Sequence, residues 1–118
     1  MAEIQCPNNE NTRMQIMAVQ DAMDILNGKW KISIIASLCH HSKRRFSDIL
    51  SDVSGISNKM LSKELKDLEI NKLVNRAVLD TQPITVEYTL TEYGLKLQTI
   101  ISHLADWGTE HRKVIIGK

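Results

Sequence analysis

Three lysines with helical spacing are the residues of this 118-residue chain whose chemistry is easiest to name. Lys59, Lys63 and Lys66 stand three or four positions apart, so on a helix they would share one face. Ammonium groups gathered in this way can bind phosphate oxygens as point charges. Lysines on an amphipathic helix are often only a solvated face, so the spacing alone leaves both interpretations open.

The opposite face of the same segment is apolar, which indicates how the lysines would be positioned. Leu61, Leu65 and Leu68 fall within about 60° of one another at ideal helical pitch, and they predict a buried stripe on a helix over residues 57–71. Ser57 can cap the start of this helix, because its hydroxyl can accept a hydrogen bond from a free first-turn amide. The acidic residues of the segment are expected toward the flanks of the cationic face: Glu64, Asp67 and Glu69.

Other reactive side chains form no recognisable catalytic or metal-binding pattern. Cys39, His40 and His41 are adjacent, so on a helix they would point in different directions, and no second cluster supplies a fourth zinc ligand. The sequence contains no nucleophile elbow, phosphate-binding loop, dinucleotide fingerprint or carboxylate pair in a recognisable setting. We therefore predict neither an enzyme nor a bound metal or cofactor.

Charge and hydropathy bound the class of protein. The formal net charge is +1, but residues 1–24 hold four acidic side chains and one basic one, so the remainder carries +4. This asymmetry permits a polyanionic partner without requiring one. No apolar run approaches the roughly 18–20 residues of a membrane span, and the N-terminus lacks the features of a secretory signal. We expect a cytoplasmic protein with no membrane contact.

Hydrophobic periodicity predicts the elements that must position the lysines. After a flexible N-terminal segment (1–11) we expect a single domain (12–118), mainly helical and of the α+β class. Its predicted helices cover 12–26, 29–41, 46–53, 57–71 and, last, 91–111, and its predicted β-hairpin has two strands, 73–79 and 84–90. The basic segment 42–45 between the second and third helices is expected to be a loop with room for a short strand. The order helix, helix, short turn, helix, hairpin is typical of a winged helix-turn-helix.

This order of elements favours DNA binding over the solvated-face interpretation of the lysines. The helix over 57–71 has the dimensions to enter the major groove of duplex DNA. Asn58, Ser62 and Lys63 are the predicted base readers, and Arg76 is the only basic residue of the hairpin, where it could equally pair with Glu87. The complete set of predicted DNA-binding residues is Lys43, Arg44, Arg45, Ser57, Asn58, Lys59, Ser62, Lys63, Lys66 and Arg76.

The terminal helices have apolar side chains beyond what a single domain needs. The helix over 12–26 is apolar on two faces, which is typical of a sandwiched helix: one face would meet the domain core and the other a second subunit. Trp30 and Trp107 are expected in the core or in a dimer interface.

Several linked motifs resemble the HxlR-type transcriptional regulators, relatives of the MarR-like winged-helix proteins. The resemblance covers residues 18–111 and rests on "AMDILNGKWKISII", "RRFSDI", "GISNKMLSKELKDLE", "LVNR", "VEYTLTEYG" and the closing "WGTEH". It implies a homodimeric bacterial regulator that binds operator DNA. In such a protein the helix after "GIS" enters the major groove, the hairpin is the wing, and the terminal helices dimerise. The homodimer interface that this resemblance implies consists of Ile16, Val19, Met23, Ile100, Leu104 and Trp107.

Three departures from the family pattern bear on function. Ile84 and Thr85 stand where the family often has Pro-Arg before V-E-Y, so the wing is poorly suited to an arginine contact in the minor groove. This poor wing keeps open an alternative, a winged-helix protein-interaction module without DNA binding. Asn27 replaces a commoner glycine, which is expected to be neutral because asparagine also tolerates left-handed geometry.

The third departure concerns Cys6. Some family members use a cysteine close before the first helix as a sensor of oxidants or electrophiles, but Cys6 lies 18 residues before Asp24, farther than in those members. A sensor needs an exposed thiol of low pKa. Cys6 is therefore the candidate redox-sensing residue, and a small-molecule or thiol-reactive effector is the candidate signal.

Overall fold

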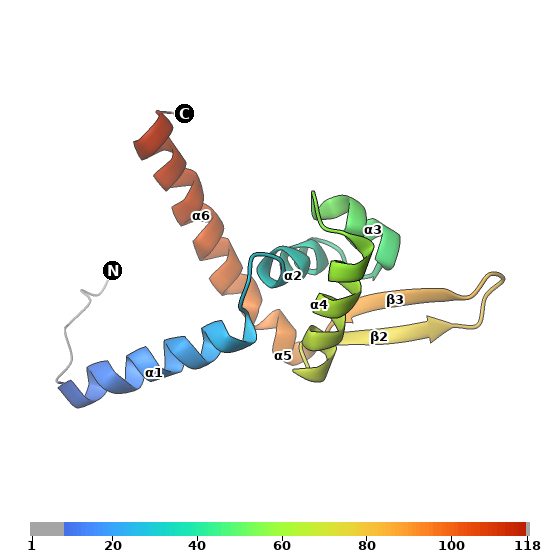
Figure 1. Ribbon diagram of the computed structural model, residues 1–118, viewed down its shortest axis with the longest axis horizontal. Helices are drawn as coiled ribbons and strands as arrows, with labels where there is room; N and C mark the ends of the chain where they lie inside the picture. The colour runs from blue at the N-terminus through green and yellow to red at the C-terminus, as the bar shows by residue number, and fades with distance from the viewer. Residues whose placement is uncertain (1–8, 118) are drawn as a thin grey trace.

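The computed structural model describes residues 9–117, and it places two long terminal helices and a projecting β-hairpin around a small helical body (Figure 1). The elements, in chain order, are α1 (Asn9–Ile25), α2 (Lys31–His40), β1 (Arg44–Arg45), α3 (Phe46–Asp52), α4 (Asn58–Ile70), β2 (Val74–Leu79), β3 (Thr85–Leu90), α5 (Glu92–Leu95) and α6 (Leu97–Ile116). The predicted order of elements and the mainly helical winged helix-turn-helix are confirmed.

The structure adds three details to the predicted elements, and two of them correct a predicted boundary. First, α1 begins at Asn9, so the last three residues of the segment expected to be loose are helical; Glu10 in the first turn suits the positive end of the helix dipole. Second, the last helix is divided at Lys96 into α5 and α6. Third, the basic segment 42–45 does contain a short strand, β1, which pairs with the free edge of the hairpin through Arg44 and Tyr88, so the sheet has three strands in the order β1-β3-β2.

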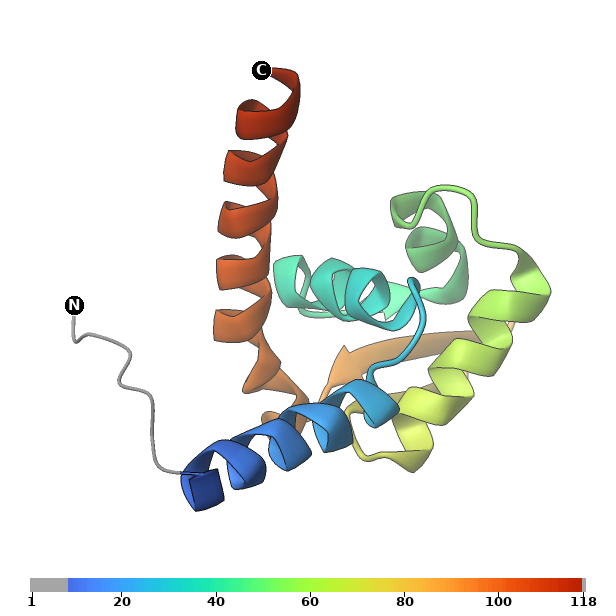
Figure 2. The same cartoon turned by 60° about the vertical axis from the view of Figure 1, so that its left-hand side comes forward.

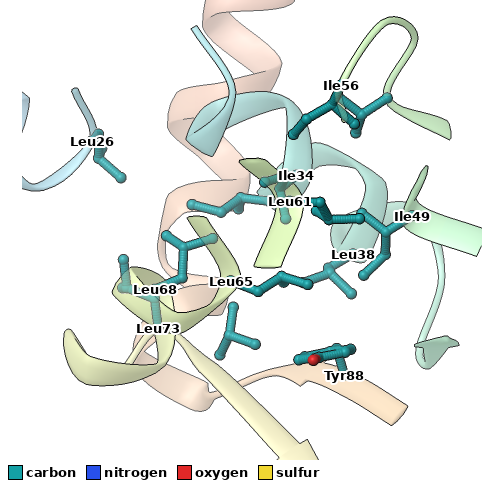
Figure 3. Packing of buried hydrophobic residues seen from close by; sticks show 13 residues of the cluster. Leu26, Ile34, Leu38, Ile49, Ile56, Leu61, Leu65, Leu68, Leu73 and Tyr88 are labelled. Carbon is teal, nitrogen blue, oxygen red and sulfur yellow. The ribbon is translucent and has the colours of Figure 1, made fainter. Parts of the chain in front are cut away.

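The hydrophobic core lies between α2, α4 and the sheet. Ile34, Ile35 and Leu38 of α2 are buried against the leucine stripe of α4, and Tyr88 closes the core from β3 (Figure 3). Trp30, just before α2, packs against this cluster and is only partly buried. Burial of these side chains is the main force that fixes α4 to the body.

The residues just after α4 and those at the start of α5 are joined by hydrogen bonds to backbone groups. Lys72 adopts the left-handed conformation after α4 (φ 64°), and the Leu73 amide donates to the Leu68 carbonyl at 3.0 Å, as in a Schellman motif. The Thr91 hydroxyl donates to the Lys72 carbonyl at 2.7 Å and accepts from the Gly94 amide at 2.8 Å. A Cβ atom at position 94 would overlap the Leu73 carbonyl oxygen, so this position requires glycine.

The terminal helices extend away from the body rather than covering it (Figure 2). The Cα radius of gyration is 17.1 Å, whereas a compact domain of this length has about 13–14 Å. The expectation that one face of α1 meets the domain core is wrong: its residues 13–25 are exposed, and Leu26, just past its end, is buried instead. No helix within residues 9–117 is long and apolar enough to cross a membrane.

Candidate nucleic-acid interface

The predicted cationic face of α4 is present and open to solvent. Lys59, Lys63 and Lys66 are all exposed, while the three leucines of the opposite face are at most 2 % exposed. The Ser57 hydroxyl caps the helix by accepting from the Met60 amide at 3.1 Å, as predicted. The leucine face of α4 is therefore held by the core, and its lysine face is open to a ligand.

The position of Glu64 differs from the expectation that it lies on a flank. Its side chain is turned inward and buried, and its Oε1 atom accepts a hydrogen bond from the Lys31 ammonium at 2.6 Å. Lys31 is also buried, at the first position of α2. Burial by itself lowers the pKa of Lys31, but hydrogen bonds and charges from Glu64 and Asp67 outweigh it and hold this pKa above its ordinary value.

The inward turn of Glu64 changes the charge that α4 presents. One of the three acidic groups of the helix is removed from the surface and neutralised by Lys31. Asp67 also lies near Lys31, with 3.4 Å between its Oδ2 atom and the ammonium nitrogen. The outward face of α4 is consequently more positive than its equal numbers of lysines and acids suggest.

A groove separates the second half of α4 from the hairpin and brings several predicted residues together. It has a volume of about 370 Å³ and is lined by Ser62, Leu65, Lys66, Glu69, Arg76 and Tyr88. Arg76 stands directly opposite Tyr88 in the sheet, whereas Glu87 stands opposite Ala77, so Arg76 and Glu87 lie on different faces. The suggested pairing of Arg76 with Glu87 is therefore wrong, and Arg76 is exposed on the face that carries the groove.

The basic residues before α3 fall into two kinds. Lys43 and Arg45 are exposed, at the outer edge of the sheet. Arg44 is half-buried, and its guanidinium donates to both carboxylate oxygens of Asp52 at 2.7–3.1 Å. The Ser37 hydroxyl donates to the same carboxylate at 2.7 Å. Arg44 thus ties β1 to the end of α3, while its two neighbours are free to meet a phosphate backbone.

Asp52 is expected to make folding stability sensitive to acid. The hydrogen bonds from Ser37 and Arg44 hold the pKa of Asp52 below its ordinary value. A carboxyl group with a lowered folded-state pKa stabilises the fold above its unfolded pKa, about 3.9, and this contribution is lost as pH falls through the folded-state pKa. Between pH 5 and pH 2, urea denaturation should show a smaller loss of stability for Asp52→Asn than for the wild type. An identical acid-dependent loss in the two proteins would contradict this role.

The tip of the wing presents apolar rather than cationic side chains. Val78 and Ile84 are 56 % and 67 % exposed. The Thr81 hydroxyl donates to the Pro83 carbonyl at 2.6 Å and lies 2.9 Å from the Thr85 hydroxyl, so the turn is held by its own side chains. These contacts occupy Thr85, which stands where the family pattern often has arginine.

The cysteine and histidine residues at the C-terminal end of α2, Cys39, His40 and His41, form no ligand cluster. Within residues 9–117 no group of three or more histidine, cysteine, aspartate or glutamate side chains is placed to hold a metal ion. Burial raises the pKa of the Cys39 thiol, so at neutral pH this cysteine stays protonated and poorly nucleophilic. Cys6 lies outside the described residues.

The sequence analysis did not predict that Lys31 and Glu64 are buried, although their spacing from buried apolar residues indicates it. Lys31 stands three positions before the buried Ile34, and Glu64 lies three after Leu61 and four before Leu68. Both charged residues therefore share the buried stripe of their helix. A charge on an apolar stripe indicates a buried partner, because an unpaired buried charge is strongly unfavourable.

Comparison with known proteins places the chain in one family. The HxlR-like helix-turn-helix family matches residues 25–115. The chain is 37% identical over 103 residues to the HTH-type transcriptional regulator YtcD of Bacillus subtilis, which covers 86% of this chain and 79% of the relative. The HTH-type transcriptional regulator YodB of the same organism is 38% identical over 92 residues, with coverages of 78% and 81%.

Solved structures give the same result. The redox regulator HypR in its reduced form has a TM-score of 0.78 and 32% identity, and the match covers 86% of this chain and 99% of that chain. The reduced form of YodB from B. subtilis has a TM-score of 0.67 and 35% identity, with coverages of 88% and 91%. These matches support DNA binding and not the alternative of an interaction module. The chain belongs to the HxlR-like helix-turn-helix family and is a DNA-binding transcriptional regulator.

Proposed function

We propose that the protein binds operator DNA as a homodimer, with α4 of each protomer in a major groove. The observation that carries this proposal is the exposed lysine face of α4, which lies opposite a fully buried leucine stripe. A helix held in this way can enter a groove about 12 Å wide without losing its own packing. In a twofold dimer the two half-sites would lie about one helical turn apart, ~34–36 Å.

The exposed apolar side chains of the terminal helices support dimerisation. The six residues predicted at the interface are 50–64 % exposed: Ile16, Val19, Met23, Ile100, Leu104 and Trp107. α6 has 20 residues and none of them is buried, although Leu97 and Ile101 at its base pack against the core. An apolar surface of this kind on two projecting helices is typical of a protein-protein interface.

The individual roles follow from exposure and position. Asn58, Ser62 and Lys63 lie on the exposed surface of α4 and are proposed to contact base edges. Lys59 and Lys66 are proposed to bind phosphates, as are Lys43 just before the edge strand β1, Arg45 within it and Arg76 across the groove. Ser57 caps the helix, and its neighbours' free amides can donate to a phosphate. Arg44 is proposed to act indirectly, by holding β1 against Asp52.

Replacing Lys63 with alanine should weaken DNA binding and reduce its dependence on salt. The Lys63 side chain is 67% exposed, and its 3.5 Å contact with Asp67 is weak enough to be exchanged for a DNA contact. If Lys63 binds a phosphate, the slope of log K against log salt should fall by about 1; if it reads a base, preference at one position should fall by about 1–3 kcal/mol. Fluorescence anisotropy with operator variants at several salt concentrations would measure both.

Lys113→Ala is the matched control for this measurement. Lys113 is also exposed, but it lies near the end of α6, far along the chain from the recognition helix. The control should leave affinity and salt slope close to those of the wild type. Equal losses in both variants would show only a general charge effect and would count against α4 as the reading helix.

We also propose that Cys6 makes the regulator responsive to thiol oxidants. The structural relatives include HypR in reduced and oxidised forms and YodB after diamide treatment. Of the two cysteines, Cys39 has a raised pKa and is poorly suited to react. Diamide should therefore change operator binding of the wild type and of Cys39→Ser, but leave Cys6→Ser unaffected. Loss or retention of DNA binding to the same degree in all three proteins would exclude Cys6 as the sensor.

A further inference from the structure

The buried Lys31 ammonium is the centre of a polar cluster that joins three parts of the chain. Its nitrogen lies 2.6 Å from Glu64 Oε1, 3.4 Å from Asp67 Oδ2 and 3.4 Å from Asn27 Oδ1. A lysine ammonium has three N–H donors, so the three oxygens can use all of them. Asn27 belongs to the connection between α1 and α2, and Glu64 and Asp67 are on successive turns of α4.

The connection itself lies close to the same carboxylate. Gly28 has a φ of 80°, a left-handed conformation that favours glycine, and a Cβ at this position would be 3.9 Å from Glu64 Oε2. The expectation for Asn27 was left-handed geometry, but the positive φ falls on Gly28, and the Asn27 side chain instead accepts a hydrogen bond from Lys31. The segment leaving α1 is thus bonded through Lys31 to α4.

This cluster supplies directional contacts that an apolar core does not. Leucine packing resists separation of two helices but is non-directional, whereas a hydrogen bond restricts both distance and angle. Glu64 accepts a hydrogen bond from Lys31, and Asp67, one turn later on α4, forms an ion pair with the same ammonium. Together these two contacts restrict the rotation of α4 and its movement along its own axis. A buried ion pair adds little net stability compared with apolar side chains of similar volume, and its best-attested use is to fix register.

We propose that Lys31 is a positioning residue for DNA recognition: it fixes α4 relative to the end of α1 and so sets the separation of the two reading helices in the dimer. This inference rests on the proposed function, because it requires α1 to lie in a dimer interface and α4 to lie in the groove. The cluster also reaches the DNA face, since Asp67 Oδ2 lies 3.5 Å from the Lys63 ammonium. A dimer whose reading helices are rigidly spaced discriminates between operators by the distance between half-sites.

The test is the dependence of affinity on half-site spacing. The double variant Lys31→Met/Glu64→Leu replaces the pair with apolar side chains of similar volume and leaves Lys59, Lys63 and Lys66 in place. Its preference for the optimal spacing over sites one base pair longer or shorter should fall by about threefold to thirtyfold. Ile49→Val, a change at a fully buried site in α3, is the control for mild destabilisation and should keep the wild-type preference.

The outcomes separate this inference from the proposed function. Loss of spacing preference in a folded, dimeric double variant supports the role of Lys31, and a wild-type preference in that variant overturns it. If the double variant does not fold, the Asn27→Ala variant is the test, because it removes only the hydrogen bond between Lys31 and the exposed α1–α2 connection. A reduced preference for the optimal half-site spacing in this variant supports the positioning role of Lys31, and an unchanged preference overturns it. If the wild type itself shows no spacing preference, the proposed dimer on paired half-sites fails as well.

Discussion

Replacing Leu104 with aspartate is expected to convert the proposed dimer into a monomer and to abolish specific operator binding. Leu104 is 52 % exposed on α6, between Ile100 and the stacked rings of Trp107 and His111, whose centroids lie 4.8 Å apart. In a twofold interface each substitution occurs twice. Two carboxylates would then be buried among apolar side chains, which is strongly unfavourable for charged groups without partners.

The loss of DNA binding should be large because the two half-sites act together. A monomer keeps the phosphate contacts of one α4 but loses the second reading helix. Specific protein–DNA complexes are typically at least about a thousandfold tighter than non-specific ones. We expect the operator affinity of Leu104→Asp to fall toward that of non-specific binding. Analytical ultracentrifugation would measure the subunit state, and anisotropy at fixed salt would measure operator affinity.

Ser102→Asp is the matched control for Leu104→Asp. Ser102 is exposed on the same helix, on the side opposite Leu104 at ideal helical pitch, so it receives the same charge without entering the proposed interface. This control should remain dimeric and bind the operator normally. A dimeric Leu104→Asp protein, or a monomer that still binds the full operator at wild-type affinity, would refute the interface that we propose on α6.

The predicted features that the structure confirms depend on short-range patterns. The leucine stripe of α4 spans only eight residues, and a period of 3.6 identifies its buried face from the sequence alone. The Ser57 cap is likewise local, because its hydroxyl accepts a hydrogen bond from the amide three residues later. The hairpin was predictable because apolar and polar residues alternate in 84–90, directly after a turn that contains proline.

The features that sequence reasoning missed depend on contacts between distant segments. A short strand was possible in the segment that contains β1, but its pairing with the free edge of β3 could not be read from two arginines. The two apolar faces of α1 could not be assigned, because its periodicity shows that the faces exist and not what covers them. Lys31 and Glu64 are 33 residues apart, so spacing could place each on a buried stripe but could not pair them.

Replacing Lys31 with methionine should destabilise the fold by about 3–5 kcal/mol at neutral pH, a large part of the roughly 5–15 kcal/mol that a domain has. The change removes the cation but leaves the Glu64 carboxylate buried and unpaired. The double variant Lys31→Met/Glu64→Leu should be more stable than the single variant, since it removes both charges together. Urea denaturation followed by circular dichroism would rank the three proteins.

Lys63→Met is the matched control for Lys31→Met, because it makes the same change on α4 at a side chain that is 67% exposed and only weakly paired. Its stability should stay within about 0.5 kcal/mol of the wild type.

The ion pair of Lys31 and Glu64 also predicts that the protein loses stability at alkaline pH. Because the folded-state pKa of Lys31 is raised, its contribution is complete below the unfolded pKa of about 10.4 and is lost as pH rises through the folded-state value. The Lys31→Met protein should lack this loss of stability at alkaline pH. If Lys31→Met is as stable as Lys63→Met at pH 7, the Lys31 ammonium is not needed to hold Glu64.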